Sequence, residues 1–459
     1  MKILILGAGQ VGSSVAAALS VEEENQITMV DRDLNRLREL TEKLDIRTVL
    51  GHASLPSVLN QAGIDEADLL VAVTSSDEVN IIACQIAAQQ TKAPTRVARL
   101  REQEYLVLAK QGLGGEAAVT AAISPEQLVC EHVERLIATP GALQVLDFAG
   151  GRAQLVAVRA LHGGALVGHE IRELRRHLPQ GMDVRVAAIF RKGQAVKPDG
   201  ITVIEAGDEV FFLAPQGAIK AMMSELRSAD KRLTKRIFIS GGGGIGRRLA
   251  KSLEKRYSVK ILERSRERAR EIAEDLLNTI VLVGDCADED LLREENIDQT
   301  DVYCALTNDD EANILSAMLA KRLGCPRVVA LINRASYAEL VEGSTIDIAI
   351  SPQSVTLSAL LSHIREGAPE RVYSLRRGAA EAIEVVVRGD RRNSKVIGRE
   401  LDDLELPEST TIGGIVRGDK LLIAHHDVMI EQGDHVILFV TNKRDLSTVI
   451  SLFKEVDWN

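Results

Sequence analysis

Short apolar runs alternate with helical patterns over the first third of the chain. Between the runs, apolar residues recur at helical spacing, as in residues 12–19 and 34–44. Strands that alternate with helices predict a parallel sheet covered by helices on both faces. Such strands are apolar almost throughout, because both of their faces are buried. The pattern predicts a doubly wound α/β domain over residues 1–135, with strands at Ile3–Leu6, Ile27–Val30, Arg47–Leu50, Leu69–Val73 and Val97–Leu100.

A smaller unit of a different kind follows at residues 141–227. Pro140-Gly141 marks the joint before it, since proline and glycine commonly end regular elements. Strands separated by turns predict an α+β domain here. The expected elements are strands at Leu143–Phe148, Gln154–Arg159, Val184–Phe190 and Val210–Leu213, with a helix at Glu170–Leu178.

The second half of the chain repeats this plan. A nucleotide-type unit is expected at residues 235–365, and an α+β unit is expected at residues 372–455. Gly7 and Gly241 are 234 positions apart, and other landmarks keep nearly the same offset. Further pairs in register are Thr74 with Thr307, Ser124-Pro125 with Ser351-Pro352, and Gly207-Asp208 with Gly433-Asp434. Self-similarity at a fixed offset indicates a duplicated module, so we expect two Rossmann-like domains, each followed by a small α+β domain.

Each nucleotide-type unit opens with a G-x-G-x-x-G loop between a strand and a helix. The first glycine permits a tight turn, the second lets a pyrophosphate approach the backbone, and the third allows close packing. The helix N-terminus then offers free N–H groups to phosphates. A turn that binds nothing is the alternative for the first loop, and a degenerate scaffold copy is the alternative for the second. The loops consist of Gly7, Ala8, Gly9, Gln10, Val11 and Gly12, and of Gly241, Gly242, Gly243, Gly244, Ile245 and Gly246.

An acidic residue ends the second expected strand of each nucleotide-type unit. Asp31 lies 19 residues beyond Gly12, and Glu263 lies 17 residues beyond Gly246. A carboxylate at this place accepts hydrogen bonds from both ribose hydroxyls and repels a 2′-phosphate. The two acids therefore favour NAD-type over NADP-type ligands, although Arg32 weakens this preference in the first copy.

Small polar residues follow the fourth expected strand of each copy. They are Thr74-Ser75 and Thr307-Asn308. Loops at the carboxyl edge of a parallel sheet form the ligand crevice, so these groups are candidates to bond a ribose or a phosphate. The alternative is a structural role in capping the next helix, with Asp77 and Asp309 as the capping residues.

Two more candidates follow other strands. Arg99 ends the fifth strand of the first copy and is a candidate phosphate ligand, with Asn333 near the matching place in the second copy. Asp285 follows the third strand of the second copy, where the first copy has His52. An adenine contact is one interpretation of Asp285, and a turn residue is the other; for Arg99 the alternative is a surface arginine.

Composition and charge exclude several classes of protein. The net charge of −10 argues against a nucleic-acid surface. The chain contains no apolar run of about 18 residues, the length that a membrane-spanning helix needs. The five cysteines show no C-x-x-C spacing and have apolar neighbours, which indicates buried, reduced thiols in a cytoplasm.

Catalytic motifs do not accompany the glycine loops in the sequence. The nine histidines are scattered without metal-ligand spacing, and neither G-x-S-x-G nor H-E-x-x-H occurs. The second loop has the glycine spacing of a P-loop, but Arg247-Arg248 stand where a lysine and a serine or threonine are required. We therefore expect no enzyme and no metal. The alternatives are an NAD-dependent oxidoreductase and an NAD-redox-sensing regulator that binds DNA.

The order of these motifs resembles that of a known family. The first half runs from the glycine loop through Asp31, the segment 74–80 and Arg99 to Ser124-Pro125 and the turn at Gly207-Asp208, and the second half repeats it. This order resembles the regulatory subunits of bacterial Trk potassium uptake systems, which contain tandem RCK domains. The resemblance covers essentially all of the chain. Gly244 departs from it, because a bulkier polar residue is expected there.

The resemblance implies a function for the whole chain. It implies a cytoplasmic protein, peripheral on the inner face of the membrane, that docks on an integral membrane potassium-transport subunit (TrkH-like). It implies binding of NAD(H), with ATP or ADP as further ligands of related members. Nucleotide binding would shift the shape of an assembly and so gate the partner. Because each chain carries two nucleotide units, we expect a homo-oligomer with an even number of chains.

Overall fold

The computed structural model describes residues 1–21, 25–90, 95–112, 118–178, 183–227, 234–341, 345–364, 369–375, 380–423, 428–442 and 445–454. The sequence also predicts joints at the charged stretch 227–236 and at Glu366-Gly367-Ala368-Pro369, and residues 228–233 and 366–368 of them lie outside the described residues. Among the described residues no helix is long and apolar enough to cross a membrane.

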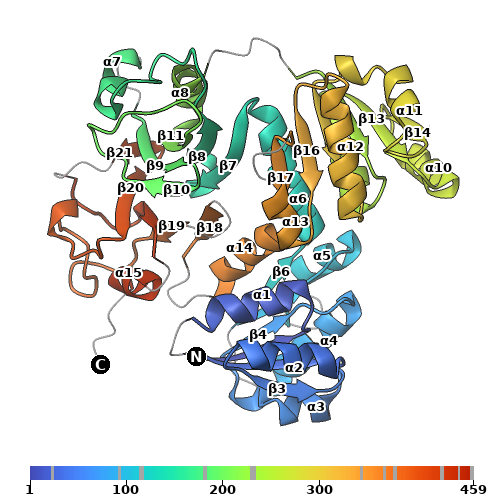
Figure 1. Ribbon diagram of the computed structural model, residues 1–459. Coiled ribbons are helices and arrows are strands. Elements are labelled where there is room, and N and C mark those ends of the chain that lie inside the picture. The colour runs from blue at the N-terminus through green and yellow to red at the C-terminus, as the bar shows by residue number, and fades with distance from the viewer. Residues whose placement is uncertain are drawn as a thin grey trace. The chain divides into compact units, whose positions relative to one another are not determined.

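The first Rossmann-like domain alternates strand and helix as the apolar pattern predicts (Figure 1). Its strands form one parallel sheet in the order β3-β2-β1-β4-β5-β6. All four positions of β4 are buried, as expected for a strand covered on both faces. The elements are β1 (Lys2–Leu6), α1 (Gln10–Leu19), β2 (Gln26–Asp31), α2 (Leu34–Lys43), β3 (Arg47–Leu50), α3 (Pro56–Gln61), β4 (Leu69–Ala72), α4 (Asp77–Gln90), β5 (Thr95–Arg99), α5 (Gln103–Lys110) and β6 (Ala121–Ile123).

The second Rossmann-like domain has the same topology. Its parallel sheet runs in the order β14-β13-β12-β15-β16-β17, which matches the first sheet strand for strand. In both sheets the strand order reverses between the first and the fourth strand, and ligands bind at such a switch point in open α/β sheets. The elements are β12 (Arg236–Ser240), α9 (Gly244–Leu253), β13 (Ser258–Glu263), α10 (Arg266–Asp275), β14 (Ile280–Val283), α11 (Glu289–Glu294), β15 (Val302–Ala305), α12 (Asp310–Arg322), β16 (Val328–Leu331), α13 (Ala335–Leu340) and β17 (Ile348–Ile350).

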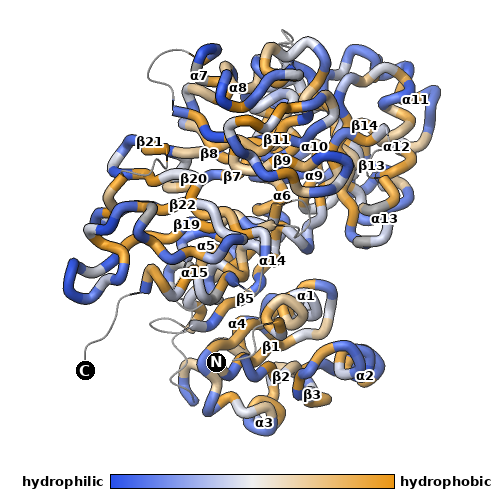
Figure 2. Tube along the Cα trace, turned by 60° about the vertical axis from the view of Figure 1, so that its left-hand side comes forward, coloured by the Kyte–Doolittle hydropathy of each residue, from blue (hydrophilic) through white to orange (hydrophobic). Residues whose placement is uncertain are grey.

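The distribution of hydropathy follows this topology. Figure 2 shows hydrophobic colour along the central strands, and hydrophilic colour on outer helices such as α2 and α11. The core of the first sheet includes Leu4, Leu70 and Ala98, each at most 1% exposed. The core of the second includes Phe238 and Tyr303, whose rings stack with their centroids 5.6 Å apart. Aliphatic packing with few aromatic rings is what a chain with 3% aromatic residues must use.

The two small domains contain antiparallel sheets of identical order. The sheet β10-β9-β11-β8-β7 corresponds to β21-β20-β22-β19-β18. The predicted α+β class is confirmed, although the short strand β10 is not predicted and the expected helix at 170–178 is only a 3-10 turn followed by α7. The elements are β7 (Ala142–Phe148), β8 (Ala153–Arg159), α7 (Leu174–His177), β9 (Arg185–Arg191), β10 (Gln194–Val196), β11 (Glu209–Ala214) and α8 (Ile219–Leu226), then β18 (Arg371–Leu375), β19 (Ala380–Val386), β20 (Thr410–Arg417), β21 (Lys420–Ile423), β22 (His435–Val440) and α15 (Leu446–Leu452).

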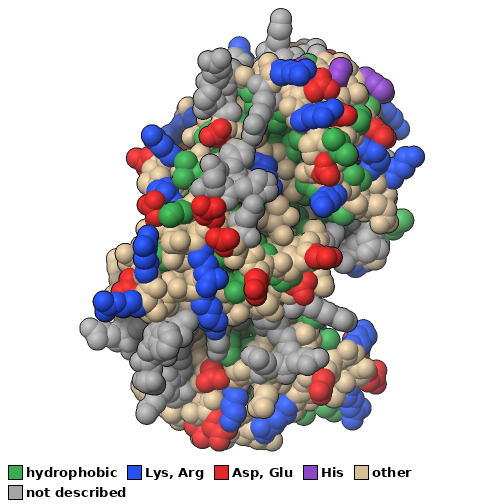
Figure 3. All heavy atoms as spheres, turned by 90° about the vertical axis from the view of Figure 1, so that its left-hand side faces the viewer, with side chains coloured by type: hydrophobic (Ala, Val, Ile, Leu, Met, Phe, Trp, Pro, Cys, Tyr) green, Lys and Arg blue, Asp and Glu red, His purple; other side chains and the backbone are tan. Residues whose placement is uncertain are grey.

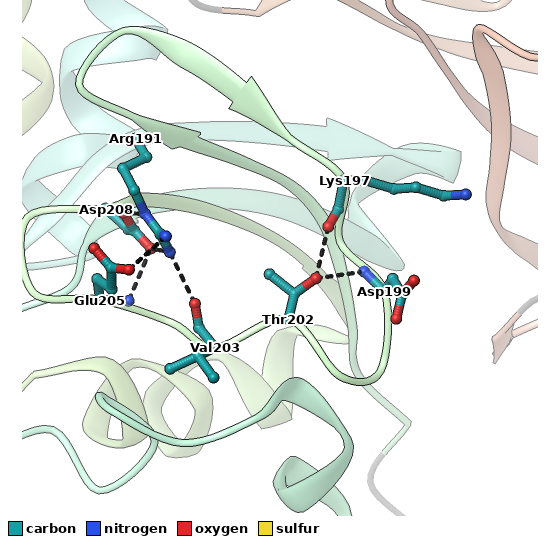
Figure 4. A network of polar contacts seen from close by, with 7 residues as sticks. All are labelled: Arg191, Lys197, Asp199, Thr202, Val203, Glu205 and Asp208. Carbon is teal, nitrogen blue, oxygen red and sulfur yellow. Dashed lines mark hydrogen bonds and ion pairs between the residues drawn. The ribbon is translucent and has the colours of Figure 1, made fainter.

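The Gly-Asp turn of the first small domain contains a buried carboxylate that forms an ion pair with the half-buried Arg191 (Figure 4). Asp208 is 1% exposed, and both of its carboxylate oxygens accept hydrogen bonds from Arg191, each at 2.9 Å. Arg191 also donates to Glu205 and to the Val203 carbonyl. Gly207 has a φ of +95°, a conformation that favours glycine. The turn therefore serves folding, by holding β9 against the loop before β11.

Two helices do not pack where the sequence pattern assigns them. The structure divides into two compact units, one containing Met1–Pro125 with Gln353–Ile412 and His425–Asn459, the other containing Glu126–Pro352 with Gly413–Ala424. The pattern assigns residues 126–135 to the first nucleotide-type unit and residues 353–365 to the second. Helices α6 (Pro125–Ala138) and α14 (Pro352–Ile364) instead group with the Rossmann-like domain of the other half.

Specific contacts fix helix α6 on the second Rossmann-like domain. Glu134 of α6 accepts a hydrogen bond from the Ser252 hydroxyl of α9 at 2.5 Å. Near the same C-terminal end of α6, the Arg327 guanidinium donates to the carbonyl of Leu136 at 2.7 Å and to that of Ala142, the first residue of β7, at 2.6 Å. Burial lowers the pKa of Arg327 to about 10, so this arginine keeps its charge at neutral pH and satisfies the Leu136 carbonyl, one of those that the helix end leaves free.

The surface in Figure 3 carries both signs of charge. Lysine and arginine side chains are interspersed with aspartate and glutamate on the face that it shows. Mixed charge of this kind is typical of an ordinary protein surface and gives no single-sign field on that face. This fits the acidic overall balance that the sequence shows.

Candidate functional site

The three glycines of the first loop each meet a different steric demand. Gly7 has a φ of +107°, and a Cβ there would lie 3.1 Å from the backbone of Thr74. A Cβ at Gly12 would lie 1.9 Å from the Gly7 carbonyl oxygen, so this position excludes every side chain. A Cβ at Gly9 would meet nothing within 4 Å. The loop is therefore tight at both ends and open in the middle, where a phosphate would approach.

The second loop reproduces this arrangement. Gly241 has a φ of +105°, and a Cβ at Gly246 would again lie 1.9 Å from the carbonyl oxygen of the first glycine. Gly243 is open within 4 Å, as Gly9 is. A degenerate copy would not need the same three constraints, so the geometry of the second loop is that of an intact fingerprint.

Neither loop helix has a side-chain cap. The N-cap residues of α1 and α9 are Gly9 and Gly243, and neither provides a capping oxygen. In contrast, α2 and α12 are capped by the carboxylates of Asp33 and Asp309. The first N–H groups of an uncapped helix are satisfied by water or by an anion. These two helix ends are therefore suited to a phosphate.

The strand-end acids face the loops. In the first copy Asp31 accepts the Ala8 N–H at 2.6 Å and the Asp33 N–H at 2.9 Å, one with each oxygen. In the second copy Glu263 accepts the Gly242 N–H at 3.0 Å and the Ser265 N–H at 2.9 Å. A carboxylate offers about four acceptor positions, so each acid still has acceptor capacity for ribose hydroxyls. Asp31 is half-buried, whereas Glu263 is buried with 9% exposed.

Thr74 belongs to a structural network. Its N–H and hydroxyl both donate to the side-chain carbonyl of Asn80, at 3.0 and 2.7 Å. The Asn80 amide donates in turn to the carbonyls of Thr74 and Arg99. Asn80 is fully buried. Through this asparagine, the loop after β4 is tied to the end of β5, so the structural alternative accounts for the Thr74 side chain.

The second copy repeats the network without change. Thr307 donates to Asn313 from its N–H and hydroxyl, at 2.9 and 2.7 Å, and the Asn313 amide donates to the Leu331 carbonyl at 2.9 Å. Sequence reasoning missed both asparagines. The available signal was their recurrence at an offset of 233 positions inside the repeated segments 74–80 and 307–313.

The expected capping role of Asp77 is wrong. Its carboxylate accepts the N–H groups of Arg101 and Glu102, at 2.7 and 2.9 Å, and so holds the loop after β5. The Ser76 hydroxyl accepts the Val79 N–H instead. In the second copy Asp309 does cap α12, and Asp310 takes the role of Asp77 by binding the loop at 333–334.

Arg99 and Asn333 do not occupy matching places. The carbonyl that Asn80 binds belongs to Arg99, and the carbonyl that Asn313 binds belongs to Leu331. Leu331, buried with 4% exposed, is therefore the counterpart of Arg99. Asn333 lies two residues further along, and its side-chain amide donates to Asp310 at 2.9 Å. Only the first copy places an arginine at the end of this strand.

The other candidates lie at the surface of the same loops. Ser75 and Asn308 are exposed, whereas the threonines that precede them are half-buried. Asp285 is exposed, and its carboxylate accepts the Ala287 N–H at 2.9 Å, which is a turn contact. His52, its counterpart, contacts the Ser54 hydroxyl at 2.8 Å. The structure thus supplies the turn role for Asp285 and leaves Ser75 and Asn308 facing solvent.

Four of the five cysteines are buried and Cys286 is half-buried. Burial raises the pKa of Cys84, Cys130 and Cys304 to about 12 and that of Cys325 to about 11. Protonated thiols of this kind are poor nucleophiles and poor metal ligands. Among the described residues no group of three His, Cys, Asp or Glu side chains could hold a metal ion.

Two Rossmann-like sheets, each with the three glycine constraints of its loop, define the chain as a tandem Rossmann-like protein. Family models agree with this class. The TrkA-N domain model matches residues 3–125 and 237–352, and the TrkA-C domain model matches residues 155–227 and 391–454. The chain is 55% identical over 456 residues to "Trk system potassium uptake protein TrkA" of Halomonas elongata, with 99% of both chains covered. The same identity and coverage hold for the protein of that name from Vibrio alginolyticus.

The chain belongs to the family of Trk system potassium uptake proteins TrkA. More distant relatives extend over nearly the same length, such as the TrkA homolog of Archaeoglobus fulgidus, 33% identical with 96% of this chain and 97% of the relative covered. Among solved structures, the "GsuK RCK domain" has a TM-score of 0.61 at 19% identity and covers 98% of this chain and 95% of its own. The "GsuK channel bound to NAD" also has a TM-score of 0.61, at 18% identity, covering 98% of this chain and 79% of its own. At this identity the likeness shows a shared fold.

Proposed function

We propose that the chain is a peripheral, cytoplasmic regulatory subunit of a potassium uptake system. NAD(H) or an adenine nucleotide binds in the Rossmann-type clefts and controls an integral membrane partner that translocates potassium. The observation that carries the proposal is the pair of uncapped glycine loops, each beside a strand-end carboxylate. The names of the relatives, and the NAD of one channel of the same fold, support it.

Several residues are proposed to hold the nucleotide. In the first copy the N–H groups after Gly9 bind the pyrophosphate, Asp31 binds a ribose, and Arg99 and Ser75 complete the carboxyl edge of the sheet. In the second copy the loop at 241–246 binds phosphate and Glu263 binds ribose, with Asn308 at the edge. Ligand discrimination then differs between the copies, because only the first has the arginine.

Regulation requires that the ligand bind two conformations with different affinity. A nucleotide shifts an equilibrium only by the difference in its binding free energy between two states. Since each half of the chain contributes a helix to the Rossmann-like domain of the other half, closure of a cleft acts on a helix that leads into a small domain. We propose that an assembly with an even number of chains converts this movement into gating of the partner.

Potassium flux into vesicles that contain the membrane partner tests the proposal. Adding the purified chain should make the flux respond to NADH or ATP, and the chain should sediment with those vesicles but not with protein-free anionic liposomes. Small-angle scattering of the chain alone should show an even-numbered oligomer whose curve changes with nucleotide. A monomer at micromolar concentration with identical curves at saturating ligand, and a flux without any nucleotide response, would contradict the proposed function.

A further inference from the structure

The helix that the second half sends to the first Rossmann-like domain contacts the nucleotide loop itself. The side-chain amide of Gln353, next to the first residue of α14, donates a hydrogen bond to the Gln10 carbonyl at 3.2 Å. The same nitrogen contacts the Ser14 hydroxyl. Gln10 follows Gly9 directly, so this amide lies on the first turn of α1, beside the helix end that is proposed to bind pyrophosphate.

The second copy has the same arrangement with different chemistry. Its loop position matching Gln10 is Gly244, and a Cβ there would lie 3.8 Å from the side chain of Glu126. Glu126 occupies in Ser124-Pro125-Glu126 the place that Gln353 occupies in Ser351-Pro352-Gln353. Each loop is therefore met by the second residue of an exchanged helix, with a neutral amide at the first loop and a carboxylate at the second.

We propose that Gln353 is a binding residue of the first nucleotide site and determines that this site accepts a pyrophosphate. The amide carries no charge that would oppose a phosphate, and its nitrogen, which contacts the Gln10 carbonyl and the Ser14 hydroxyl, is a donor on the helix that follows the loop. Its nitrogen is directed to α1, and on ligand binding one of its hydrogens turns to a pyrophosphate oxygen. The inference rests on the proposed nucleotide function, because it names a ligand contact of that same site.

The charge at residue 353 is the decisive property. Glutamate has nearly the shape of glutamine but cannot donate and adds a negative charge beside two negative phosphates. It would not harm α14, because an acidic residue in the first turn of a helix is favourable. A loss of binding in Gln353→Glu would therefore report on the ligand contact and not on loss of the helix.

The test is a titration of the full-length chain with NADH in a Glu263→Ala background, so that the first site is measured. At about 20 mM salt, Gln353→Ala should bind roughly three- to tenfold more weakly, since one hydrogen bond to a charged group is lost. Gln353→Glu should bind at least about thirtyfold more weakly. The difference in NADH affinity between Gln353→Glu and Gln353→Ala should shrink at about 500 mM salt, because salt screens the repulsion that the glutamate adds.

The matched control is Glu126→Gln, the reverse exchange on the other half, which should leave affinity at the first site unchanged. Thermal unfolding of each variant should match that of the parent. Gln353→Glu binding within about twofold of the parent, or no more weakly than Gln353→Ala, would overturn the inference while leaving the proposed function intact. If neither the Glu263→Ala parent nor the wild-type chain binds NADH, the proposed function itself is contradicted. This result would be known before any Gln353 variant is compared.

Discussion

The two Rossmann-like domains share their framework and differ where a ligand would lie. Three glycine constraints, a buried asparagine and a strand-end acid recur at matching places in both copies. The residues beside the crevice do not recur, since Arg99 is replaced by Leu331 and Gln353 by Glu126. Duplication has thus kept the residues that shape the loops and has changed the residues that we propose to select the ligand. When matching residues of the two copies are substituted, we expect equal changes in the free energy of unfolding and unequal changes in nucleotide affinity.

The largest expected effect tests the equality of the two frameworks. Gly12→Ala and Gly246→Ala should each reduce the free energy of unfolding by about 3 kcal/mol or more, because the new methyl group meets a backbone oxygen that cannot move freely. In both loops the added Cβ would lie 1.9 Å from that oxygen. Urea unfolding measures the effect. Gly9→Ala and Gly243→Ala are the controls, where open space predicts a change below about 1 kcal/mol. A loss of stability in only one of Gly12→Ala and Gly246→Ala would contradict the claim that the two domains share their framework.

The next effect concerns the acid of the first copy. Asp31→Ala should weaken NADH binding at the first site by roughly 10- to 100-fold, or about 1.5–3 kcal/mol, because a charged acceptor of ribose hydroxyls is lost. Calorimetry on the full-length chain measures the affinity. Asp45→Ala, an exposed acid at the opposite edge of the same sheet, should change nothing. Unaltered affinity in Asp31→Ala, with a native circular dichroism spectrum, would remove Asp31 from the site.

Full-length protein is required for such measurements. Each half in isolation would lack the helix that its Rossmann-like domain receives from the other half, α14 in the first case and α6 in the second. A separated first half would also lose Gln353 from its loop. Binding measured on halves would therefore report on an incomplete site.

A smaller effect separates the two copies by charge. Arg99→Leu gives the first copy the residue of the second and should lower NADH affinity at the first site by about tenfold, roughly 1.4 kcal/mol, as expected for one lost contact to a phosphate. The dependence of this NADH affinity on salt concentration should fall as well, because a cation near the ligand is removed. The reference is Arg32→Leu, beside Asp31, which we expect to have a weaker effect. If Arg99→Leu binds NADH as tightly as wild type, the arginine does not distinguish the copies.

Much of the architecture could be predicted from the amino-acid sequence. Buried parallel strands read as apolar runs, and glycines at fixed spacing identify the loops, so the Rossmann-like class and the duplication follow from local pattern. The pattern could not show that residues 126–138 pack on the other half, because helix periodicity specifies an apolar face and not its partner. It also could not tell which of two adjacent polar residues caps a helix, Ser76 or Asp77 in the first copy, since both satisfy the capping preference.

The candidate site could be predicted only in part, because a local sequence pattern does not show which residues meet in space. Asp31 and Glu263 stand at a fixed distance from their loops and could be identified. Thr74 could not be distinguished from a ligand residue, because its structural partner Asn80 is recognised only when its buried amide is seen to bridge two loops. Gln353 could not be predicted at all, since it lies 343 residues from the carbonyl that it contacts.

The smallest effect concerns thiol chemistry. At pH 8, a thiol with a pKa of about 12 is ionised to roughly 1 part in 10,000, so Cys84, Cys130 and Cys304 should react very slowly with a disulfide reagent. Cys286, which is only half-buried, should react first. Counting thiols released over time in native and in urea-unfolded protein measures this. Rapid reaction of several thiols in native protein would mean that one of the two Rossmann-like domains opens readily.

The most direct test of the account is a titration of the full-length chain with NADH in wild type, Gly9→Val and Gly243→Val. An added Cβ meets nothing within 4 Å at either position, so both variants should keep the fold while the valine side chain blocks the approach of a pyrophosphate. The account predicts that the two variants lose NADH binding unequally, with the larger loss in Gly9→Val, because Arg99 and Gln353 belong to the first site. Equal loss in the two variants, or a wild-type chain that binds no nucleotide, would contradict the claim that the chain contains two nucleotide clefts with different ligand selection.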